Sequence, residues 1–174
     1  MADVLKPLFS HREIQKTVRR LAREISRDYK GEEIVCVCIL KGSFMFTSDL
    51  IRQIKAPLII DFIRVSSYGT GMTSRGEITV TMDLETDVSG RHVLIVEDII
   101  DSGLTLSWIR ETLLARNAKS VKIVALVDKK ARRVVDVPCE YVGFTIEDGF
   151  IVGYGIDYAE KYRNLRDIYV VEKE

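Results

Sequence analysis

Three short, strongly apolar runs constrain the fold of this chain more than any other feature. They cover residues Ile34–Leu40, Val93–Val96 and Val121–Val127, and β-branched side chains are frequent in each. Such runs are typical of strands buried on both faces, because a strand with one solvated face alternates apolar and polar residues. The sequence therefore predicts a mostly parallel sheet that is covered on both sides.

Helix signals occupy the segments between these runs. Ser10 and Glu13 form a capping box, and apolar residues recur behind it at helical spacing until Lys30-Gly31 ends the pattern. A second helix is expected from about Phe44 to Ile54 and a third from about Ser102 to Ala115. Strands that alternate with helices predict an α/β domain whose ligands bind beyond the carboxyl ends of the strands.

The remaining extended segments are shorter. They are predicted at Leu58–Val65, Ile78–Met82, Tyr141–Phe144, Phe150–Gly155 and Ile168–Val171. Residues Ser66–Gly76 are polar and contain three glycines, so we expect a long loop there. No internal repeat, low-complexity tract or linker divides the sequence, which we interpret as a single domain of residues 1–174.

The overall composition disfavours several classes of function. Lysine plus arginine equals aspartate plus glutamate, 26 of each, so no net charge favours nucleic acid or an anionic membrane. No apolar run approaches the roughly 20 residues that cross a bilayer, and residues Met1–Ser10 lack a signal-peptide stretch. Cys36 and Cys38 lie at or beyond the reach of a disulfide, and with Cys139 they are expected to be core residues. We expect a soluble cytoplasmic protein.

The most informative motif is VLIVEDIIDSGLT, residues Val93–Thr105. An apolar strand leads to two adjacent acids, Glu97 and Asp98, and a turn with Gly103 then opens a helix. A helix start presents free backbone N–H groups and the positive end of the helix dipole, which together bind phosphate. The two carboxylates accept hydrogen bonds from hydroxyl groups or bind Mg²⁺. A phosphate site beside a diol site predicts a phosphorylated ribose.

The motif resembles the phosphoribosyl-pyrophosphate signature of type I phosphoribosyltransferases, in which an apolar strand precedes two acids, two apolar residues and Asp-Ser/Thr-Gly-x-Thr. Other segments resemble the hypoxanthine-guanine branch of that family, in the same order and spacing over nearly the whole chain. These are Leu40-Lys41-Gly42-Ser43-Phe44, Ser66-Ser67-Tyr68-Gly69, Val127-Asp128-Lys129-Lys130 and Phe150–Tyr158. The resemblance implies a twisted, mostly parallel sheet flanked by helices, with a core of about residues 30–135 and a small hood from about residues 1–12 and 140–174.

The resemblance also implies a reaction. A protein of this branch transfers the 5-phosphoribosyl group of phosphoribosyl pyrophosphate to a 6-oxopurine, hypoxanthine or guanine or both. The products are IMP or GMP and pyrophosphate, and the physiological role is purine salvage. The implied cofactor is Mg²⁺, and the implied assembly is a homodimer or homotetramer.

Site residues follow from the same resemblance, position by position. The ribose-phosphate group is assigned to Glu97, Asp98, Asp101, Ser102, Gly103, Leu104 and Thr105, and the pyrophosphate to Leu40, Lys41, Gly42, Ser67, Tyr68 and Arg163. The purine is assigned to Lys129, Phe150, Ile151 and Asp157, and the metal to Glu97, Asp98 and Asp157. Residues Ser66–Gly76 resemble a mobile lid, and the Leu40–Lys41 peptide bond is cis in the family.

Two of these assignments have a direct physical reason. Asp101 resembles the general base, and a carboxylate at a helix start stays ionised and can accept a proton. Lys129 resembles the donor to the 6-oxo group, and an ammonium, which only donates, disfavours the amino group of adenine. Simpler interpretations stay open: Asp101 as a helix cap, Lys129 in a solvated basic run, Phe150 in the core, and Asp157 or Arg163 in a surface ion pair.

Three other classes of function remain as alternatives. A regulator on this fold would sense phosphoribosyl pyrophosphate and hold nucleic acid on a basic face, which the zero net charge and the Phe150–Asp157 segment disfavour. A nucleotide-hydrolysing protein would carry G-x-x-x-x-G-K-[ST], which Lys41-Gly42-Ser43 only imitates. A pyrimidine or adenine phosphoribosyltransferase is nearer to the observed pattern.

Overall fold

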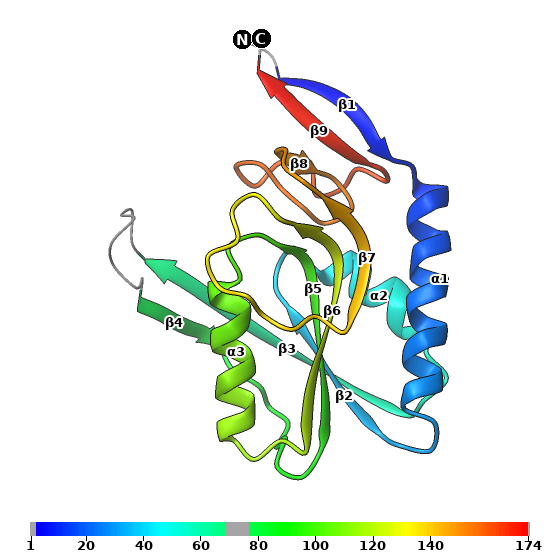
Figure 1. Cartoon of the computed structure of the whole chain (residues 1–174), viewed down its shortest axis with the longest axis vertical. Coiled ribbons are helices and arrows are strands. Elements are labelled where there is room, and N and C mark those ends of the chain that lie inside the picture. Colours follow the sequence, from blue (N-terminus) through cyan, green and yellow to red (C-terminus); the bar gives the residue numbers. More distant parts are fainter. Residues whose placement is uncertain (1–2, 69–76, 174) are drawn as a thin grey trace.

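The computed structural model describes residues 3–68 and 77–173. In these residues a central sheet (Figure 1) contains β2 (Ile34–Ile39), β3 (Leu58–Tyr68), β4 (Glu77–Met82), β5 (His92–Ile100), β6 (Ser120–Lys129) and β7 (Tyr141–Ile146). The order across the sheet is β4-β3-β2-β5-β6-β7. Neighbouring strands are parallel except β3 and β4, which are antiparallel. The predicted mostly parallel sheet is confirmed.

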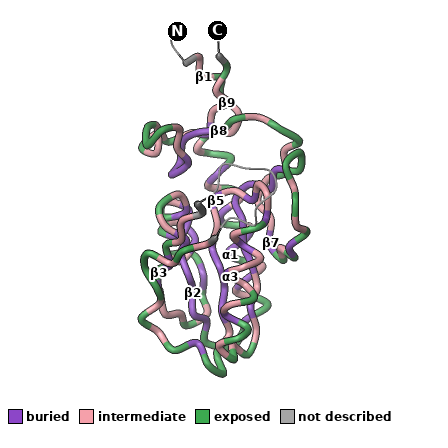
Figure 2. Tube along the Cα trace, turned by 90° about the vertical axis from the view of Figure 1, so that its left-hand side faces the viewer, coloured by how far each residue is buried: buried purple, intermediate pink, exposed green. Residues whose placement is uncertain are grey.

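Helices cover both faces of this sheet, as predicted. α1 (His11–Asp28) and α2 (Phe44–Ile51) pack on one face, and α3 (Leu104–Ala115) packs on the other (Figure 1). Alternate residues of β2 enter the two cores: Cys36 packs on the side of α1 and α2, and Val37 on the side of α3. All six residues of β2 are buried, which is the pattern that a continuous apolar run predicts (Figure 2).

The capping box at the start of α1 forms as the sequence predicts. Ser10 Oγ accepts a hydrogen bond from the backbone N–H of Glu13 at 3.3 Å, and Glu13 Oε2 accepts one from the N–H of Ser10 at 2.8 Å. The helix buries one apolar stripe, made of Ile14, Val18, Leu21, Ala22 and Ile25. It ends at Asp28, with Tyr29 as its C-cap, and Gly31, whose φ is 81°, then carries the chain away from the helix axis.

A second, smaller sheet unites the two ends of the described chain. It contains β1 (Asp3–Phe9), β8 (Ile151–Val152) and β9 (Ile168–Lys173), in the order β1-β9-β8 with antiparallel pairing. In Figure 1 it lies above the central sheet, with both termini at its tip. This sheet corresponds to the hood that the resemblance implies. The strand at Asp3–Phe9 was not expected, because its apolar residues do not alternate regularly.

Several predicted boundaries were wrong, among them the ends of β3, α2 and β5 and the extent of β8. β3 continues to Tyr68, because Ser66 and Tyr68 pair with Thr79 and Glu77 of β4, so the predicted loop begins later than Ser66. The remainder of that loop, residues 69–76, lies outside the described residues. α2 ends at Ile51 rather than Ile54.

β5 also continues past the predicted apolar run. It extends to Ile100, because Ile99 and Ile100 pair with Val127 and Asp128 of β6. The acids Glu97 and Asp98 consequently lie inside the strand, where parallel pairing fixes their backbone. No helix among the described residues is long and apolar enough to cross a membrane.

Candidate active site

Most of the candidate site residues lie at the carboxyl end of the parallel strands in the central sheet. β2, β5 and β6 are parallel neighbours, so their carboxyl ends meet there. Cys38 of β2 lies opposite Val96 of β5, and Ile100 of β5 lies opposite Asp128 of β6. The segments that follow these strands bring the predicted pyrophosphate, ribose-phosphate and purine residues into neighbouring positions.

Glu97 and Asp98 form a pair of adjacent carboxylates near the end of β5. Asp98 is 9% exposed, and its backbone N–H donates to Glu97 Oε1 at 3.0 Å. Burial and the neighbouring charge of Asp98 raise the pKa of Glu97 well above its ordinary value, and burial raises the pKa of Asp98. A buried carboxylate beside a half-buried one favours a ligand that supplies a cation or hydroxyl donors.

A hollow of about 190 Å³ opens where β5 leads into α3. Gly103, the N-cap of α3, has a φ of 82°, and a Cβ there would lie 2.4 Å from the carbonyl oxygen of Val135. Glycine is therefore required by both conformation and space. The hollow is lined by Glu97, Ile99, Ile100, Asp101, Ser102, Gly103, Thr105 and Leu106. A helix start that faces a small polar hollow is suited to a phosphate group.

Leu104 is the first residue of α3, and its side chain is exposed. Its backbone N–H donates to Ser102 Oγ at 3.3 Å, which ties the turn to the helix start. Among the predicted phosphate residues, Leu104 therefore presents an exposed apolar side chain, while its backbone N–H contacts Ser102.

Lys129 ends β6 beside Asp101. Its side-chain nitrogen lies 3.4 Å from Asp101 Oδ1, although the lysine is only 5% exposed. Asp101 Oδ1 is buried and accepts no hydrogen bond from the described residues. The neighbouring Lys130 and Arg133 instead pair with Asp128. Lys129 is thus separated from the basic run that follows it, and its buried ammonium lies next to Asp101, which lines the hollow.

Arg133 connects two segments of the site and was missed by the sequence interpretation. Its Nε donates to the carbonyl oxygen of Asp101 at 3.1 Å, and its Nη2 donates to the carbonyl oxygen of Lys129 at 3.2 Å and pairs with Asp128. Burial opposes ionisation of Asp128, but the bonds from Lys130 and Arg133 outweigh it and lower the pKa of the carboxyl group. Only the basic, loop-like composition after Lys129 signalled this residue.

The loop after β2 closes tightly on the acid pair. The Leu40–Lys41 peptide bond is cis, as the resemblance implies. A Cβ on Gly42 would lie 2.0 Å from Asp98 Oδ2, and a Cβ on Gly155 would lie 2.2 Å from the carbonyl oxygen of Gly42. Gly42 is therefore enclosed between the central sheet and the hood, and only glycines at both positions permit this approach.

The hood segment carries an exposed ring and two charged groups. Phe150 is exposed, and its ring packs edge-on against Tyr158 with the centroids 5.1 Å apart, whereas Ile151 is buried. Asp157 Oδ1 lies 2.9 Å from Nη2 of Arg163. Arg163 also donates through Nη1 to the carbonyl oxygen of Gly155 at 2.8 Å, so its guanidinium is held beside the loop that contains Gly42.

Two further groups of predicted residues are the metal ligands and the pyrophosphate residues of β3. The described residues contain no cluster of three His, Cys, Asp or Glu suited to a metal ion, and Asp157 pairs with Arg163. Ser67 and Tyr68 end β3, and only their backbone is described. The acid pair alone still fits Mg²⁺, which commonly uses one or two carboxylates together with substrate oxygens and waters.

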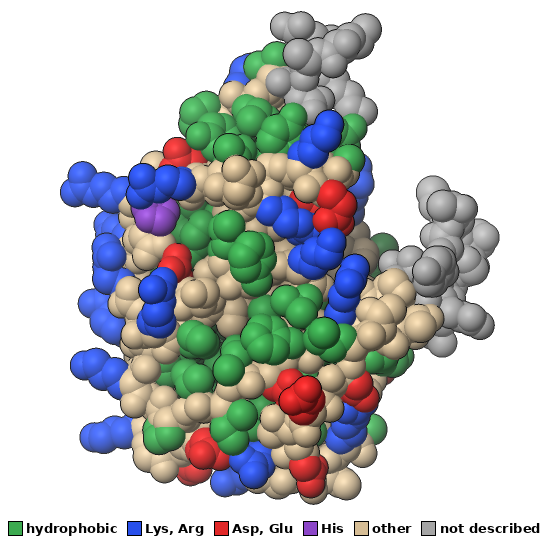
Figure 3. Space-filling view, turned by 180° about the vertical axis from the view of Figure 1, so that it is seen from behind, with side chains coloured by type: hydrophobic (Ala, Val, Ile, Leu, Met, Phe, Trp, Pro, Cys, Tyr) green, Lys and Arg blue, Asp and Glu red, His purple; other side chains and the backbone are tan. Residues whose placement is uncertain are grey.

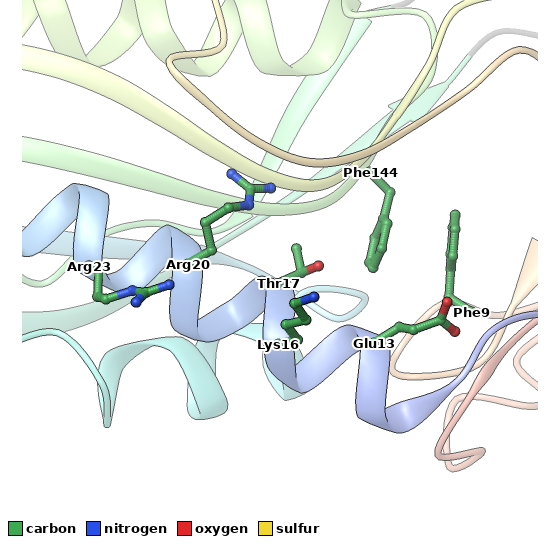
Figure 4. A pocket seen from close by; sticks show the side chains of 7 residues that line it. All are labelled: Phe9, Glu13, Lys16, Thr17, Arg20, Arg23 and Phe144. Carbon is green, nitrogen blue, oxygen red and sulfur yellow. The ribbon is translucent and has the colours of Figure 1, made fainter.

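A separate hollow of about 320 Å³ lies along α1. Its lining consists of Phe9, Glu13, Lys16, Thr17, Arg20, Arg23 and Phe144 (Figure 4). The rings of Phe9 and Phe144 stack with their centroids 3.9 Å apart. Viewed from behind, lysine and arginine side chains gather along the edge that α1 forms (Figure 3). None of the predicted site residues lines this hollow, so it is distinct from the candidate site.

Comparison with known proteins identifies the family. The model of the phosphoribosyl transferase domain matches residues 5–159. The hypoxanthine-guanine phosphoribosyltransferase of Bacillus subtilis is 48% identical over 170 residues, which cover 98% of this chain and 94% of that protein. The crystal structure of a hypoxanthine-guanine phosphoribosyltransferase from Bacillus anthracis, with HEPES in its active site, has a TM-score of 0.91 and 46% identity, and the match covers 98% of this chain and 99% of that one.

A longer relative shares the same match. The bifunctional protein TilS/HprT of Listeria monocytogenes is 46% identical over 172 residues, or 99% of this chain, which spans 26% of that relative's length. With a matched domain and a relative covered almost end to end, the chain belongs to the phosphoribosyl transferase domain family, in its hypoxanthine-guanine phosphoribosyltransferase branch.

Proposed function

We propose that this protein transfers the 5-phosphoribosyl group from phosphoribosyl pyrophosphate to hypoxanthine, guanine or both, releasing pyrophosphate and the nucleotide IMP or GMP in purine salvage. The observation that carries the proposal is the contact between the buried Lys129 and Asp101, 3.4 Å apart at the hollow where α3 begins. A donor for an oxo group and an acceptor for a ring proton lie together, next to a helix start suited to phosphate. The membership of the family supports the same reaction.

The ribose-phosphate group is proposed to bind along the hollow of β5 and α3. The 5′-phosphate accepts hydrogen bonds from backbone N–H groups of residues 102–105 and from the hydroxyls of Ser102 and Thr105. Glu97 and Asp98 accept hydrogen bonds from the two ribose hydroxyls, which relieves their mutual repulsion. The raised pKa of Glu97 supports this role, because a buried carboxylate gains most from a donor that arrives with the ligand.

The purine is proposed to lie between the central sheet and the hood. Lys129 donates to the 6-oxo group, Phe150 stacks on the ring, and the backbone of Ile151 meets the purine edge, near Asp157. The exposure of Phe150 supports this placement, since a ring of that size is usually buried unless a ligand or partner covers it. The simpler interpretation of Phe150 as a core residue is wrong.

Asp101 is proposed as the general base. The bond between a purine ring nitrogen and the anomeric carbon forms while the bond from that carbon to pyrophosphate breaks, and the leaving pyrophosphate takes the electron pair. The proton of the ring nitrogen passes to the carboxylate of Asp101. The assignment is supported by its Oδ1, which lies 3.4 Å from the Lys129 nitrogen and accepts no hydrogen bond from the described residues. The carboxylates of Glu97 and Asp98 stabilise the positive charge that develops on the ribose.

The leaving pyrophosphate is proposed to bind at the loop after β2 and at the hood. Backbone N–H groups of Leu40–Gly42, the side chains of Lys41 and Arg163, and Ser67 with Tyr68 at the edge of the lid would bind it. A planar guanidinium suits paired phosphate oxygens. Bound Mg²⁺, held by Glu97 and Asp98 with substrate oxygens and by Asp157 through waters, would neutralise charge on the pyrophosphate.

A second copy of the chain is the proposed partner, in a homodimer or homotetramer. Ile60, Phe62 and Met82 are exposed and surround a hollow of about 350 Å³ on β3 and β4. Exposed apolar groups that gather on one surface are typical of an interface. We propose a cytoplasmic location, with no nucleic acid or membrane partner.

The test is base-dependent release of pyrophosphate from phosphoribosyl pyrophosphate, measured with hypoxanthine, guanine, xanthine and adenine, with and without Mg²⁺. Release is expected with 6-oxopurines and Mg²⁺ and is expected to be much slower with adenine. Release with adenine alone would assign an adenine-specific enzyme instead. Binding of labelled RNA without release in the presence of any base would favour the regulator.

A further inference from the structure

Glu160 contacts both of the cations assigned to pyrophosphate. Its Oε2 lies 2.9 Å from Lys41 Nζ, and its Oε1 lies 3.3 Å from Nη2 of Arg163. Asp157 approaches the same Nη2 at 2.9 Å and accepts the backbone N–H of Glu160 at 2.8 Å. A single carboxylate therefore bridges a cation of the loop after β2 and a cation of the hood, as an anionic ligand would.

The backbone at Glu160 is unusual for this residue type. Tyr158 and Lys161 exchange backbone hydrogen bonds of 3.1 and 2.9 Å, and the two residues between them, Ala159 and Glu160, have φ values of 49° and 64°. Two central residues with positive φ define a type I′ hairpin turn, in which glycine, asparagine and aspartate are preferred. A glutamate there is locally unfavourable, which points to a role for its side chain.

The contacts of Glu160 are suited to reversible exchange. Its side chain is 66% exposed, so solvent screens its ion pairs and makes them weak. The hydrogen bond from Lys41 lowers the pKa of the carboxyl group, so Glu160 is ionised at neutral pH. Arg163 keeps its Nε buried and without a hydrogen-bond partner among the described residues. The contacts of Glu160 therefore leave this nitrogen of Arg163 unused.

We propose that Glu160 occupies the pyrophosphate site of the free protein and is displaced by pyrophosphate or by the diphosphate of phosphoribosyl pyrophosphate. The proposal rests on the function proposed above, because it takes Lys41 and Arg163 as pyrophosphate ligands. Glu160 keeps the two cations close together before substrate binds, and its return competes with the product. Its carboxylate therefore weakens diphosphate binding and speeds release of pyrophosphate.

Two substitutions of Glu160 test this competition. Glu160→Gln removes the charge and keeps the shape, and Glu160→Gly also suits the φ of 64°, so it is expected to fold. Calorimetry with pyrophosphate and Mg²⁺ should give a Kd about 2- to 10-fold lower in both variants, the range set by losing two exposed ion pairs. The gain should shrink as salt is raised, because salt screens the pairs that the wild type must break.

The matched control is Glu33→Gln. Glu33 forms an ion pair with Arg91 at the same distance of 2.9 Å, and its side chain is 54% exposed. It precedes β2, whereas Lys41 follows β2, so the two residues lie at opposite ends of the strand. The affinity of the Glu33→Gln variant for pyrophosphate should equal that of the wild type. The affinity of the Glu160 variants for IMP without pyrophosphate should also be unchanged, because the 5′-phosphate binds at α3.

Unchanged or weaker pyrophosphate binding in both Glu160 variants would overturn the inference, and weaker binding would assign Glu160 to the metal instead. Base-dependent release of pyrophosphate from phosphoribosyl pyrophosphate by the wild type is measured separately. If release is absent while the variants bind pyrophosphate more tightly, the proposed function fails and this inference stands. If release occurs and binding does not tighten, only this inference fails.

Discussion

The side-chain nitrogen of Lys129 lies 3.4 Å from Asp101 Oδ1, and both atoms belong to segments that Arg133 joins through hydrogen bonds to their backbone. A buried ammonium and a partly exposed carboxylate stabilise each other in the free protein. A 6-oxopurine that bound between them would accept a hydrogen bond from one and give a proton to the other. The two proposed contacts to the base are therefore mutually dependent.

Asp101→Asn tests the proposed base without removing the backbone contact to Arg133. Asparagine keeps the size of the side chain but cannot accept the ring proton. The forward rate should fall by about 10²–10⁴, the usual range for loss of a general base. The affinity for phosphoribosyl pyrophosphate, measured by calorimetry, should change little. Near-normal turnover in Asp101→Asn, together with loss of turnover in folded Asp98→Asn, would show that Asp101 is not the base.

Lys129→Ala tests recognition of the 6-oxo group. The KM for hypoxanthine or guanine should rise far more than the KM for phosphoribosyl pyrophosphate, because only the base loses a hydrogen-bond donor. Lys130→Ala is the control, since the Lys130 side chain is 49% exposed and pairs with Asp128 rather than with Asp101. An equal rise in both KM values, or a similar effect in the control, would contradict the assignment.

Gly103→Ala tests whether the turn before α3 requires glycine for space as well as conformation. Gly31 has nearly the same φ, 81° against 82°, but nothing lies within 4 Å of a Cβ there. Gly31→Ala should lower the free energy of unfolding by about 1–2 kcal/mol, the cost of a left-handed side chain. Gly103→Ala should lower it by about 2–5 kcal/mol, because Val135 also obstructs the new methyl group. Equal losses in urea denaturation would show that the steric contact is unimportant.

Glu97→Gln should stabilise the ligand-free protein at neutral pH while it weakens ribose binding. The pKa of Glu97 is raised in the folded protein, so the folded state holds the proton more tightly than the unfolded state does. Protonation therefore stabilises the fold, and this contribution is lost as pH rises from the ordinary value of 4.5 through the raised pKa.

The gain in Tm of Glu97→Gln over wild type should consequently be largest at neutral pH and vanish below about pH 4.5, the ordinary pKa of a glutamate. Glu33→Gln serves as the control, because its side chain is exposed and pairs with Arg91 at the surface, and its Tm should show no comparable gain over wild type at neutral pH. A destabilised Glu97→Gln protein at neutral pH would contradict the raised pKa.

The architecture could be predicted from the sequence because the patterns that indicate its strands and helices are local. The apolar runs of β2, β5 and β6 fill both cores, so their composition alone predicts two-sided burial. β1 was missed because its partner, β9, lies at the other end of the chain, and pairing rather than pattern makes it a strand. The extension of β3 to Tyr68 has the same cause, since pairing with β4 satisfies its backbone.

The candidate site could be predicted from the sequence only in part. The turn at Gly103 and the acids of β5 are contiguous, so their chemistry appears in a short motif. The resemblance, rather than any local signal, supplied Lys129, and only the structure shows that it is buried. Arg133 and Glu160 act through contacts between segments distant along the chain, at Asp101 and Lys41, and such contacts leave no periodic trace in a sequence.

The order of strands in the small sheet has a consequence for the newly made chain. β9 lies between β1 and β8, so neither of its neighbours has a partner until residues 168–173 leave the ribosome. The central sheet ends at Ile146 and can form earlier during synthesis. A nascent chain should therefore acquire the turn at Gly103 first, and the ring of Phe150, which is proposed to stack on the purine, should become fixed only when β9 has been made.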